Sequence, residues 1–227
     1  GEIVGLVGPH GAGKTTLYDC ITGMTPMNAG EVTFCDEKIT TMKPHEVARR
    51  GLARAFQLTR VFGGLTVLEN VIMGQQKFLV GNLWNTIRSL FRESRRSESI
   101  EVAMKLIEQV KLSGREHAQA GSLPIGERKR LELAIALATK PKLSLLDEPT
   151  AGMNPTETND VIVMLNRLKA DGLGISVVEH DMRMIMTASD RVVVLNLGRK
   201  IAEGKPQEIS NNPVVIEAYL GKKTGTT

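Results

Sequence analysis

The stretch 2-EIVGLVGPHGAGKT-15 decides the fold of this chain. A short apolar strand runs into a glycine-rich turn, and a helix is predicted to follow over about 14–21. The segment 8–15 matches the pattern G-x-x-x-x-G-K-[ST], with the strand and the helix that this pattern requires on either side. These flanks disfavour the alternative, a glycine-rich turn that contains a lysine by chance. The pattern predicts that the chain binds a nucleoside triphosphate.

The chemistry of phosphate binding explains the spacing of this loop. Glycine allows the backbone to curve closely around phosphates, so that N–H groups point inward at the positive end of a helix dipole. Lys14 can reach the β- and γ-phosphates, and the Thr15 hydroxyl can ligate Mg²⁺. The predicted nucleotide-binding residues are Gly8, Pro9, His10, Gly11, Ala12, Gly13, Lys14, Thr15 and Thr16.

A second apolar strand, 143-LSLLDE-148, ends in two acidic residues. In a protein with this phosphate loop, Asp147 would hold Mg²⁺ through water, and Glu148 is placed to take a proton from attacking water. An acidic turn at the end of a strand is the alternative. The phosphate loop earlier in the chain favours the catalytic interpretation.

Two further polar residues follow predicted strands. His180 comes after the strand 175–179, and the C-terminal ends of parallel strands are where such sheets bind ligands. A catalytic and a structural role are equally open for it on this ground. Gln57 follows a strand at 52–56 and carries little information by itself.

Strands and helices alternate along both ends of the chain. Near-continuous apolar strands in such an alternation predict an α/β protein with a mostly parallel, buried sheet. The block 58–140 is helical instead, so we expect a helical subdomain inserted into an α/β core of 1–57 and 141–227. The remaining predictions are strands at 31–35 and 191–198, helices at 44–50, 98–110, 155–170 and 181–188, and one buried face made of Ile100, Ala103, Met104, Ile107 and Val110.

The composition is that of an ordinary soluble globular protein. Of the 227 residues, 41% are hydrophobic and 24% charged, and the net charge of +4 suits an anionic ligand or a membrane surface. No apolar run is long enough to cross a bilayer. Cys20 and Cys35 form no CxxC pair, which argues against a zinc site or a disulfide framework and favours a reducing cytoplasm.

Taken together and in this order, these motifs resemble the nucleotide-binding subunit of ABC transporters over essentially the whole chain. The resemblance identifies 8–15 as Walker A, 143–147 as Walker B and 151-AGMN-154 as the D-loop. It also implies that Glu148, His180 and Gln57 are catalytic, and that Thr15, Gln57 and Asp147 bind the metal. The signature motif is 123-LPIGE-127, at the start of the helix 128–137, with residues Leu123, Pro124, Ile125, Gly126 and Glu127.

The same resemblance implies the partners and the location. Two such subunits, a homodimer or a paralogous heterodimer, would pair head to tail and hold each ATP between one phosphate loop and the other subunit's signature helix. The N-terminal amides and dipole of that helix would point at the γ-phosphate. The dimer would act on transmembrane permeases, and indirectly on a solute-binding protein, from the cytoplasmic face of the plasma (inner) membrane. No nucleic-acid partner is expected.

Three longer segments, 51–74, 84–96 and 198–221, are similar to ATPases of branched-chain amino acid importers. Relatives that serve urea, other amides or another small solute remain alternatives, because substrate choice resides in the other subunits. A soluble ABC protein of translation or DNA repair is a further alternative. Such proteins usually carry two cassettes or a long coiled-coil insertion, and neither is present here. A P-loop kinase would lack LPIGE followed by DEPTAGMN.

Some residues depart from the family pattern. His10 stands where asparagine is usual, Pro124 replaces the signature serine, Ile135 replaces an arginine and Asn154 replaces the D-loop aspartate. Pro124 would suit the first turn of the signature helix, so that backbone donors around Gly126 contact the phosphate.

The chain begins at Gly1, and we expect that it begins within a longer protein. The strands before the phosphate loop and the aromatic residue that stacks on adenine would then be absent. Tyr18 lies on the helix of the loop and would not replace that residue, so weak nucleotide affinity is expected. The apolar and arginine-rich stretch 78–96 fits either a packed helix or, less well, an amphipathic helix on a membrane surface.

Overall fold

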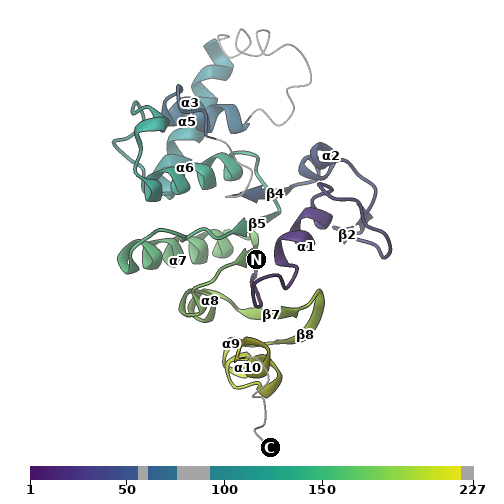
Figure 1. Ribbon diagram of the computed structural model, residues 1–227. Helices are drawn as coiled ribbons and strands as arrows, with labels where there is room; N and C mark the ends of the chain where they lie inside the picture. The colour runs from purple at the N-terminus through teal and green to yellow at the C-terminus, as the bar shows by residue number, and fades with distance from the viewer. Residues whose placement is uncertain (56–60, 76–92, 221–227) are drawn as a thin grey trace, which may run out of the picture.

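The computed structural model describes residues 1–55, 61–75 and 93–220 (Figure 1). Gln57 and most of the stretch 78–96 therefore lie outside the described residues, and so do the expectations attached to them. Among the described helices, none is both long and apolar enough to span a bilayer.

A six-stranded sheet forms the centre of the molecule. Its strands lie in the order β4-β5-β6-β1-β7-β8, and the first five are parallel while β8 runs antiparallel to β7. The α/β class and the mostly parallel sheet that the sequence predicts are therefore confirmed. The bounds are β1 Ile3–Val7, β4 Leu52–Ala55, β5 Leu143–Asp147, β6 Gly174–Val178, β7 Arg191–Asn196 and β8 Arg199–Gly204.

The pattern of side chains explains why these segments lie within the sheet. Leu145 and Leu146 are both buried, but they point to opposite faces and join two different apolar clusters. A strand that is buried on both faces needs such a continuous apolar run. The strand predicted at 31–35 is much shorter, because only β2 (Thr33–Phe34) pairs with β3 (Glu37–Lys38), in a separate hairpin.

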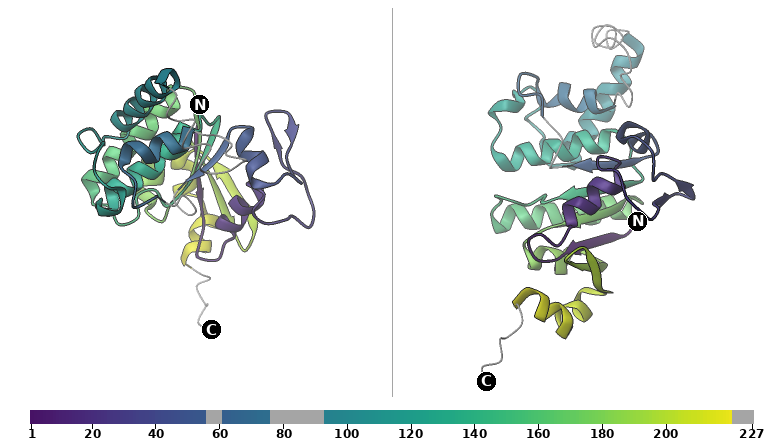
Figure 2. Two further views of the ribbon diagram at one scale, coloured as in Figure 1. Left: turned by 90° about the horizontal axis from the view of Figure 1, so that it is seen from above. Right: turned by 45° about the vertical axis from the view of Figure 1, so that its right-hand side comes forward.

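Helices cover both faces of the sheet (Figures 1 and 2). Helices α1 and α2 lie on one side, and α6, α7 and α8 lie on the other. Helices α9 and α10 follow β8, and the short 3₁₀ helix η1 precedes α6. The bounds are α1 Lys14–Ile21, α2 Pro44–Arg49, α3 Val67–Gln75, α5 Glu93–Gln109, η1 Ala120–Ser122, α6 Ile125–Ala138, α7 Pro155–Ala170, α8 Met182–Ala188, α9 Pro206–Ser210 and α10 Pro213–Leu220.

Helices α3, α5 and α6 pack on one another, and α6 also contacts β4. Gly74 allows a close approach, because a Cβ atom there would lie 2.7 Å from the carbonyl oxygen of Ile135. We propose that these helices belong to an inserted subdomain covering 58–140.

The predicted buried face is correct at Ala103 and Ile107 of α5 and at Val110 just after it, whereas Ile100 is only half-buried and Met104 is exposed. Met104 is one residue beyond Ala103, which turns it about 100° around the helix and away from the neighbouring helices.

Candidate nucleotide-binding site

The loop between β1 and α1 has the shape that phosphate binding requires. Gly8, Gly11 and Gly13 all have positive φ angles, at 155°, 75° and 96°. A Cβ atom on Gly8 would lie 2.1 Å from the carbonyl oxygen of Leu195, so only glycine fits there. Gly13 is the N-cap of α1 and supplies no side-chain cap, which leaves the first amides of the helix available to an anion.

Lys14 folds back over this loop. Its Nζ donates hydrogen bonds to the carbonyl oxygens of Gly8 at 2.7 Å and Pro9 at 3.1 Å. The side chain is buried, and burial lowers the pKa of its ammonium group, while Asp147 and Glu148 act in the opposite direction. The amine is thus held on the concave side of the loop by backbone acceptors.

Asp147 ends β5 and is almost completely buried. Its Oδ2 accepts a hydrogen bond from Nη2 of Arg54 on the neighbouring strand β4. Arg54 also pairs with Asp19 of α1, and its guanidinium lies over the ring of Tyr18. The Tyr18 hydroxyl donates to Ser176 Oγ at 2.9 Å, so this ring packs between α1 and the sheet. Tyr18 lies on α1, the helix on which the sequence predicts it.

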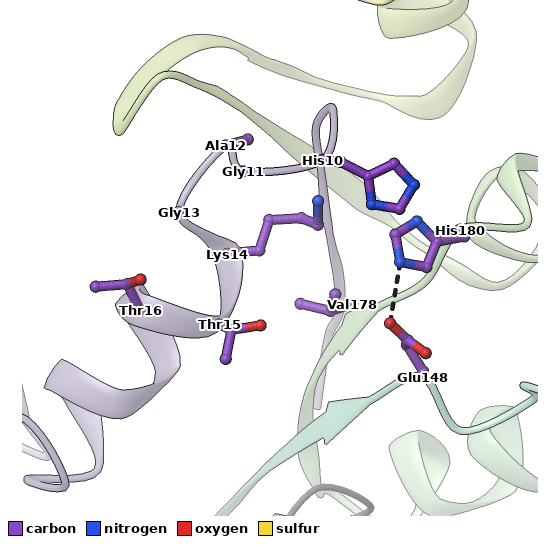
Figure 3. Close-up of a pocket in the computed structure, with 10 residues that line it drawn as sticks. All are labelled: His10, Gly11, Ala12, Gly13, Lys14, Thr15, Thr16, Glu148, Val178 and His180. Atoms are coloured by element: carbon purple, nitrogen blue, oxygen red, sulfur yellow. Dashed lines mark hydrogen bonds and ion pairs between the residues drawn. The ribbon is translucent and has the colours of Figure 1, made fainter.

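The side chains of Glu148, His180 and His10 lie together on one side of the pocket, opposite the start of helix α1 (Figure 3). Nε2 of His180 lies 2.9 Å from Oε1 of Glu148, and the rings of His180 and His10 stack with centroids 4.8 Å apart. They border a pocket of about 280 Å³ whose lining is His10, Gly11, Ala12, Gly13, Lys14, Thr15, Thr16, Glu148, Val178 and His180. The fold therefore brings the predicted base Glu148 and His180 together at the edge of one pocket.

The backbone turns sharply directly after Asp147. Glu148 has a φ of 54°, in the left-handed region that a residue with a side chain rarely adopts. Its N–H donates to the carbonyl oxygen of Val178 on β6 at 2.8 Å. The loop that follows is fastened by Glu179, whose Oε1 accepts from both the N–H and the hydroxyl of Thr150 at 2.6 Å.

Sequence reasoning did not identify Glu179 or Arg54 as parts of this site. Glu179 is buried, and a buried carboxylate needs hydrogen bonds of this kind to be tolerated. The available indication was its position: an acidic residue at the end of an apolar strand and directly before His180. Arg54 carried a comparable indication, since a cation in a strand beside an acidic strand end is the expected partner of a buried aspartate.

The signature residues lie at the N-terminal end of α6, apart from the pocket residues. Pro124 is the N-cap, and α6 begins at Ile125, so the expectation that Pro124 occupies the first helical turn is wrong by one residue. Pro124 cannot cap with its side chain, which leaves the amides of residues 125–127 available. Gly126 lies close to Glu157: a Cβ there would lie 3.1 Å from its Oε1, a tight contact that the end of the Glu157 side chain would have to relieve.

Two other signature and D-loop residues have local structural roles. Glu127 turns back along the chain, and its Oε1 accepts a hydrogen bond from Nη2 of Arg115 at 3.1 Å. Asn154 is the N-cap of α7: its Oδ1 accepts from the N–H of Glu157 at 3.0 Å, and Glu157 accepts from the N–H of Asn154. An asparagine serves this capping box as well as an aspartate does.

The residues present fit a magnesium ion that is shared with phosphates. Thr15 and Asp147 supply hydroxyl and carboxylate oxygens, which are the ligand types that Mg²⁺ prefers. Within the described ranges, no group of three or more His, Cys, Asp and Glu side chains could enclose a metal ion. Mg²⁺ in nucleotide sites characteristically binds through one or two protein groups and the substrate phosphates, so this limited donor set is appropriate.

A phosphate loop of this geometry, with a carboxylate at the opposite wall, places the chain among the P-loop nucleotide-binding proteins. The model of the ABC transporter family matches residues 1–151, and the chain belongs to that family. Residues 199–223 also match the model of the branched-chain amino acid ATP-binding cassette transporter. The family binds ATP.

Two relatives align with nearly all of the chain. It is 38% identical over 226 residues to the high-affinity branched-chain amino acid transport ATP-binding protein BraF of Pseudomonas aeruginosa, covering 97% of this chain and 88% of that protein. The identity to LivG of Escherichia coli, which has the same descriptive name, is 38% over 224 residues with the same coverage.

Solved structures agree with this assignment. A nucleotide-free ATP-binding cassette from an ABC transporter superposes with a TM-score of 0.82 at 33% identity, covering 97% of this chain and 88% of that one. An ATP-binding cassette in its ADP conformation gives a TM-score of 0.83 at 32% identity, with the same coverage.

Proposed function

We propose that this chain is the ATP-hydrolysing subunit of a membrane importer of branched-chain amino acids. The names of the relatives support the substrate class, and the match of residues 199–223 supports the same branch. The subunit would act at the cytoplasmic face of the plasma (inner) membrane, bound to transmembrane permeases. A solute-binding protein would deliver the amino acid to those permeases. Import of urea, another amide or another small solute is the alternative within the same ATPase role.

The proposed hydrolytic activity rests on the contact between Glu148 Oε1 and His180 Nε2, which lie 2.9 Å apart beside the phosphate loop. A carboxylate at this position can accept the proton of a water molecule that attacks the γ-phosphate. His180 fixes the orientation of that carboxylate through this contact. Lys14, on the opposite side, offsets the negative charge that develops on the phosphates.

A magnesium ion would be held by Thr15 and Asp147, together with Gln57, and would neutralise charge on the β- and γ-phosphates. The chain's own residues set up the rest of the site. Gly8, Gly11 and Gly13 curve the loop so that its amides face the phosphates. His10 stacks on His180 and closes one side of the pocket.

We further propose a head-to-tail dimer, either of two copies or with a paralogous subunit. The N-terminal end of α6 supports this arrangement, because its first amides have no side-chain cap and its first residue, Ile125, is an exposed apolar side chain. Free amides at a helix N-terminus suit a phosphate, and an exposed apolar residue beside them suits a protein partner.

Two measurements test this proposal. Phosphate release from ATP by the purified chain, compared with Glu148→Gln, tests hydrolysis and the assigned base. Uptake of radiolabelled leucine, isoleucine and valine by a host that lacks the gene, complemented with wild type or Glu148→Gln, tests the transported substrate. Restoration by wild type alone supports the proposal. Restored uptake of urea without restored amino acid uptake would favour the alternative, and copurification with ribosomes or DNA rather than permeases would reject both.

A further inference from the structure

Lys129 on α6 contacts the main chain of Glu148. Its Nζ donates a hydrogen bond to the carbonyl oxygen of Glu148, although the two residues belong to different elements of the fold. Lys129 lies about one helical turn from Ile125, at the start of the same helix. The side chain thus joins the signature helix to the residue that the proposed function assigns as the general base.

The surroundings of Lys129 favour a fixed position. The side chain is half-buried, and burial lowers the pKa of its ammonium group. The carboxyl groups of Glu179, Glu132 and Glu148 each act in the opposite direction when they are ionised, because they then attract the ammonium group. A half-buried cation surrounded by acidic groups and bonded to a carbonyl oxygen is held more firmly than an exposed lysine.

Glu148 needs such support because its backbone is strained. Its φ of 54° is unfavourable for any residue with a side chain, and the conformation persists only where neighbouring groups enforce it. Val178 holds its N–H, His180 holds its carboxylate and Lys129 holds its carbonyl oxygen. Removal of Lys129 frees the carbonyl end of this residue, which allows the peptide to rotate and the carboxylate to move.

We propose that Lys129 is a positioning residue for ATP hydrolysis, which acts by fixing the main chain of Glu148 in the same subunit. This inference rests on the proposed role of Glu148 as the base. It predicts a defect in the chemical step and not in nucleotide binding, because Lys129 is absent from the lining of the phosphate pocket. It also means that a displacement of the signature helix is passed to the carbonyl group of the catalytic glutamate.

The first test compares Lys129→Met, Lys129→Arg and Lys105→Met with wild type. Methionine keeps most of the length of the side chain and removes the donor, whereas arginine keeps a donor. Lys105 on α5 is an exposed lysine paired with Glu101, and it serves as the matched control. We expect kcat of Lys129→Met to fall between about tenfold and a hundredfold, as misplaced catalytic groups do. KM, the ATP dissociation constant and the melting temperature should stay close to wild type.

The other variants complete the pattern. Lys129→Arg should recover most of kcat, and Lys105→Met should match wild type. Two results would overturn the positioning role. One is a change in KM or in the melting temperature of Lys129→Met that accounts for its loss of activity. The other is a kcat of Lys129→Arg as low as that of Lys129→Met.

A double variant tests whether Lys129 acts through Glu148. In a Glu148→Ala background the residual single-turnover rate should not respond to Lys129→Met, because the group to be positioned is gone. The same fold loss in both backgrounds would overturn the inference. The wild-type rate and the arrest of Glu148→Gln are measured alongside. If wild type does not hydrolyse ATP, the proposed function fails; if it does and Lys129→Met equals it, only this inference fails.

Discussion

Nη2 of Arg54 lies 3.1 Å from Oδ2 of Asp147, and the two side chains are 5% and 7% exposed. The pair joins adjacent parallel strands at the edge of the sheet that faces the phosphate loop. Arg54 makes a second ion pair with Asp19 on α1. One buried cation therefore holds the proposed metal-binding aspartate against both the sheet and the first helix.

Substitution of Arg54 by methionine should lower the free energy of unfolding by about 3 to 5 kcal/mol, because it leaves Asp147 charged, buried and without this cation. Urea denaturation at neutral pH measures the loss. Asp19→Asn is the matched control: Asp19 is 30% exposed, so loss of its pairing should cost about 1 kcal/mol. Equal losses of unfolding free energy in the two variants would show that the buried pair of Arg54 with Asp147 adds no stability beyond that of the pair with Asp19.

Glu148→Gln should retain ATP binding and stop turnover. Glutamine has almost the same shape and can still bond to His180, but it cannot accept the proton of the attacking water. General-base catalysis contributes roughly 10² to 10⁴ in rate, so the single-turnover rate should fall by at least about a hundredfold. Rapid-quench measurements with enzyme in excess over ATP give this rate. Several turnovers per site at a rate near wild type would remove Glu148 from the role of base.

Lys14→Ala should abolish nucleotide binding while the fold survives. The Lys14 amine is held beside the phosphate loop by the carbonyl oxygens of Gly8 and Pro9, in position to bind phosphate oxygens. Titration with a fluorescent ATP analogue measures binding, and circular dichroism checks the fold. The control is Lys200→Ala, because Lys200 pairs with Glu203 on the exposed strand β8 and lies outside the pocket. Undiminished affinity in Lys14→Ala would contradict the assignment.

The sequence predicted the features that depend on local patterns. The glycine spacing around Lys14 and the apolar run before Asp147 specify a loop and a buried strand by themselves, whatever the rest of the chain does. The strand β8 was not predicted, since its alternation is weak and it carries the charged residues of an exposed edge.

Contacts between residues far apart in the sequence could not be predicted in this way. The partner of Arg54 lies 93 residues away, and the partner of Glu179 lies 29 residues away. No periodicity encodes such pairings, because the order of the strands in the sheet creates them. The same holds for Lys129, whose position in helix α6 indicates only an ordinary polar residue until the fold places Glu148 beside it.

The stability of the fold should depend on pH through Glu132 of α6. Burial raises the pKa of this carboxyl to about 7, and the charges of Lys129 and Arg128 reduce the effect without cancelling it. The folded protein therefore keeps the proton between about pH 4.5 and 7, where the unfolded chain has lost it. The associated stability is complete below about pH 4.5 and is lost as the pH rises through 7, since the native state must then bury a charge.

Glu132→Gln removes this titration and keeps the shape of the side chain. The variant should gain stability relative to wild type between pH 5 and pH 8, by up to about 3 kcal/mol. Urea unfolding at a series of pH values measures the difference, with Glu108→Gln at an exposed position of α5 as the control. The control difference should stay constant over this range. A constant difference for Glu132→Gln as well would mean that the carboxyl is ionised in the folded protein throughout, solvated or neutralised by the neighbouring cations.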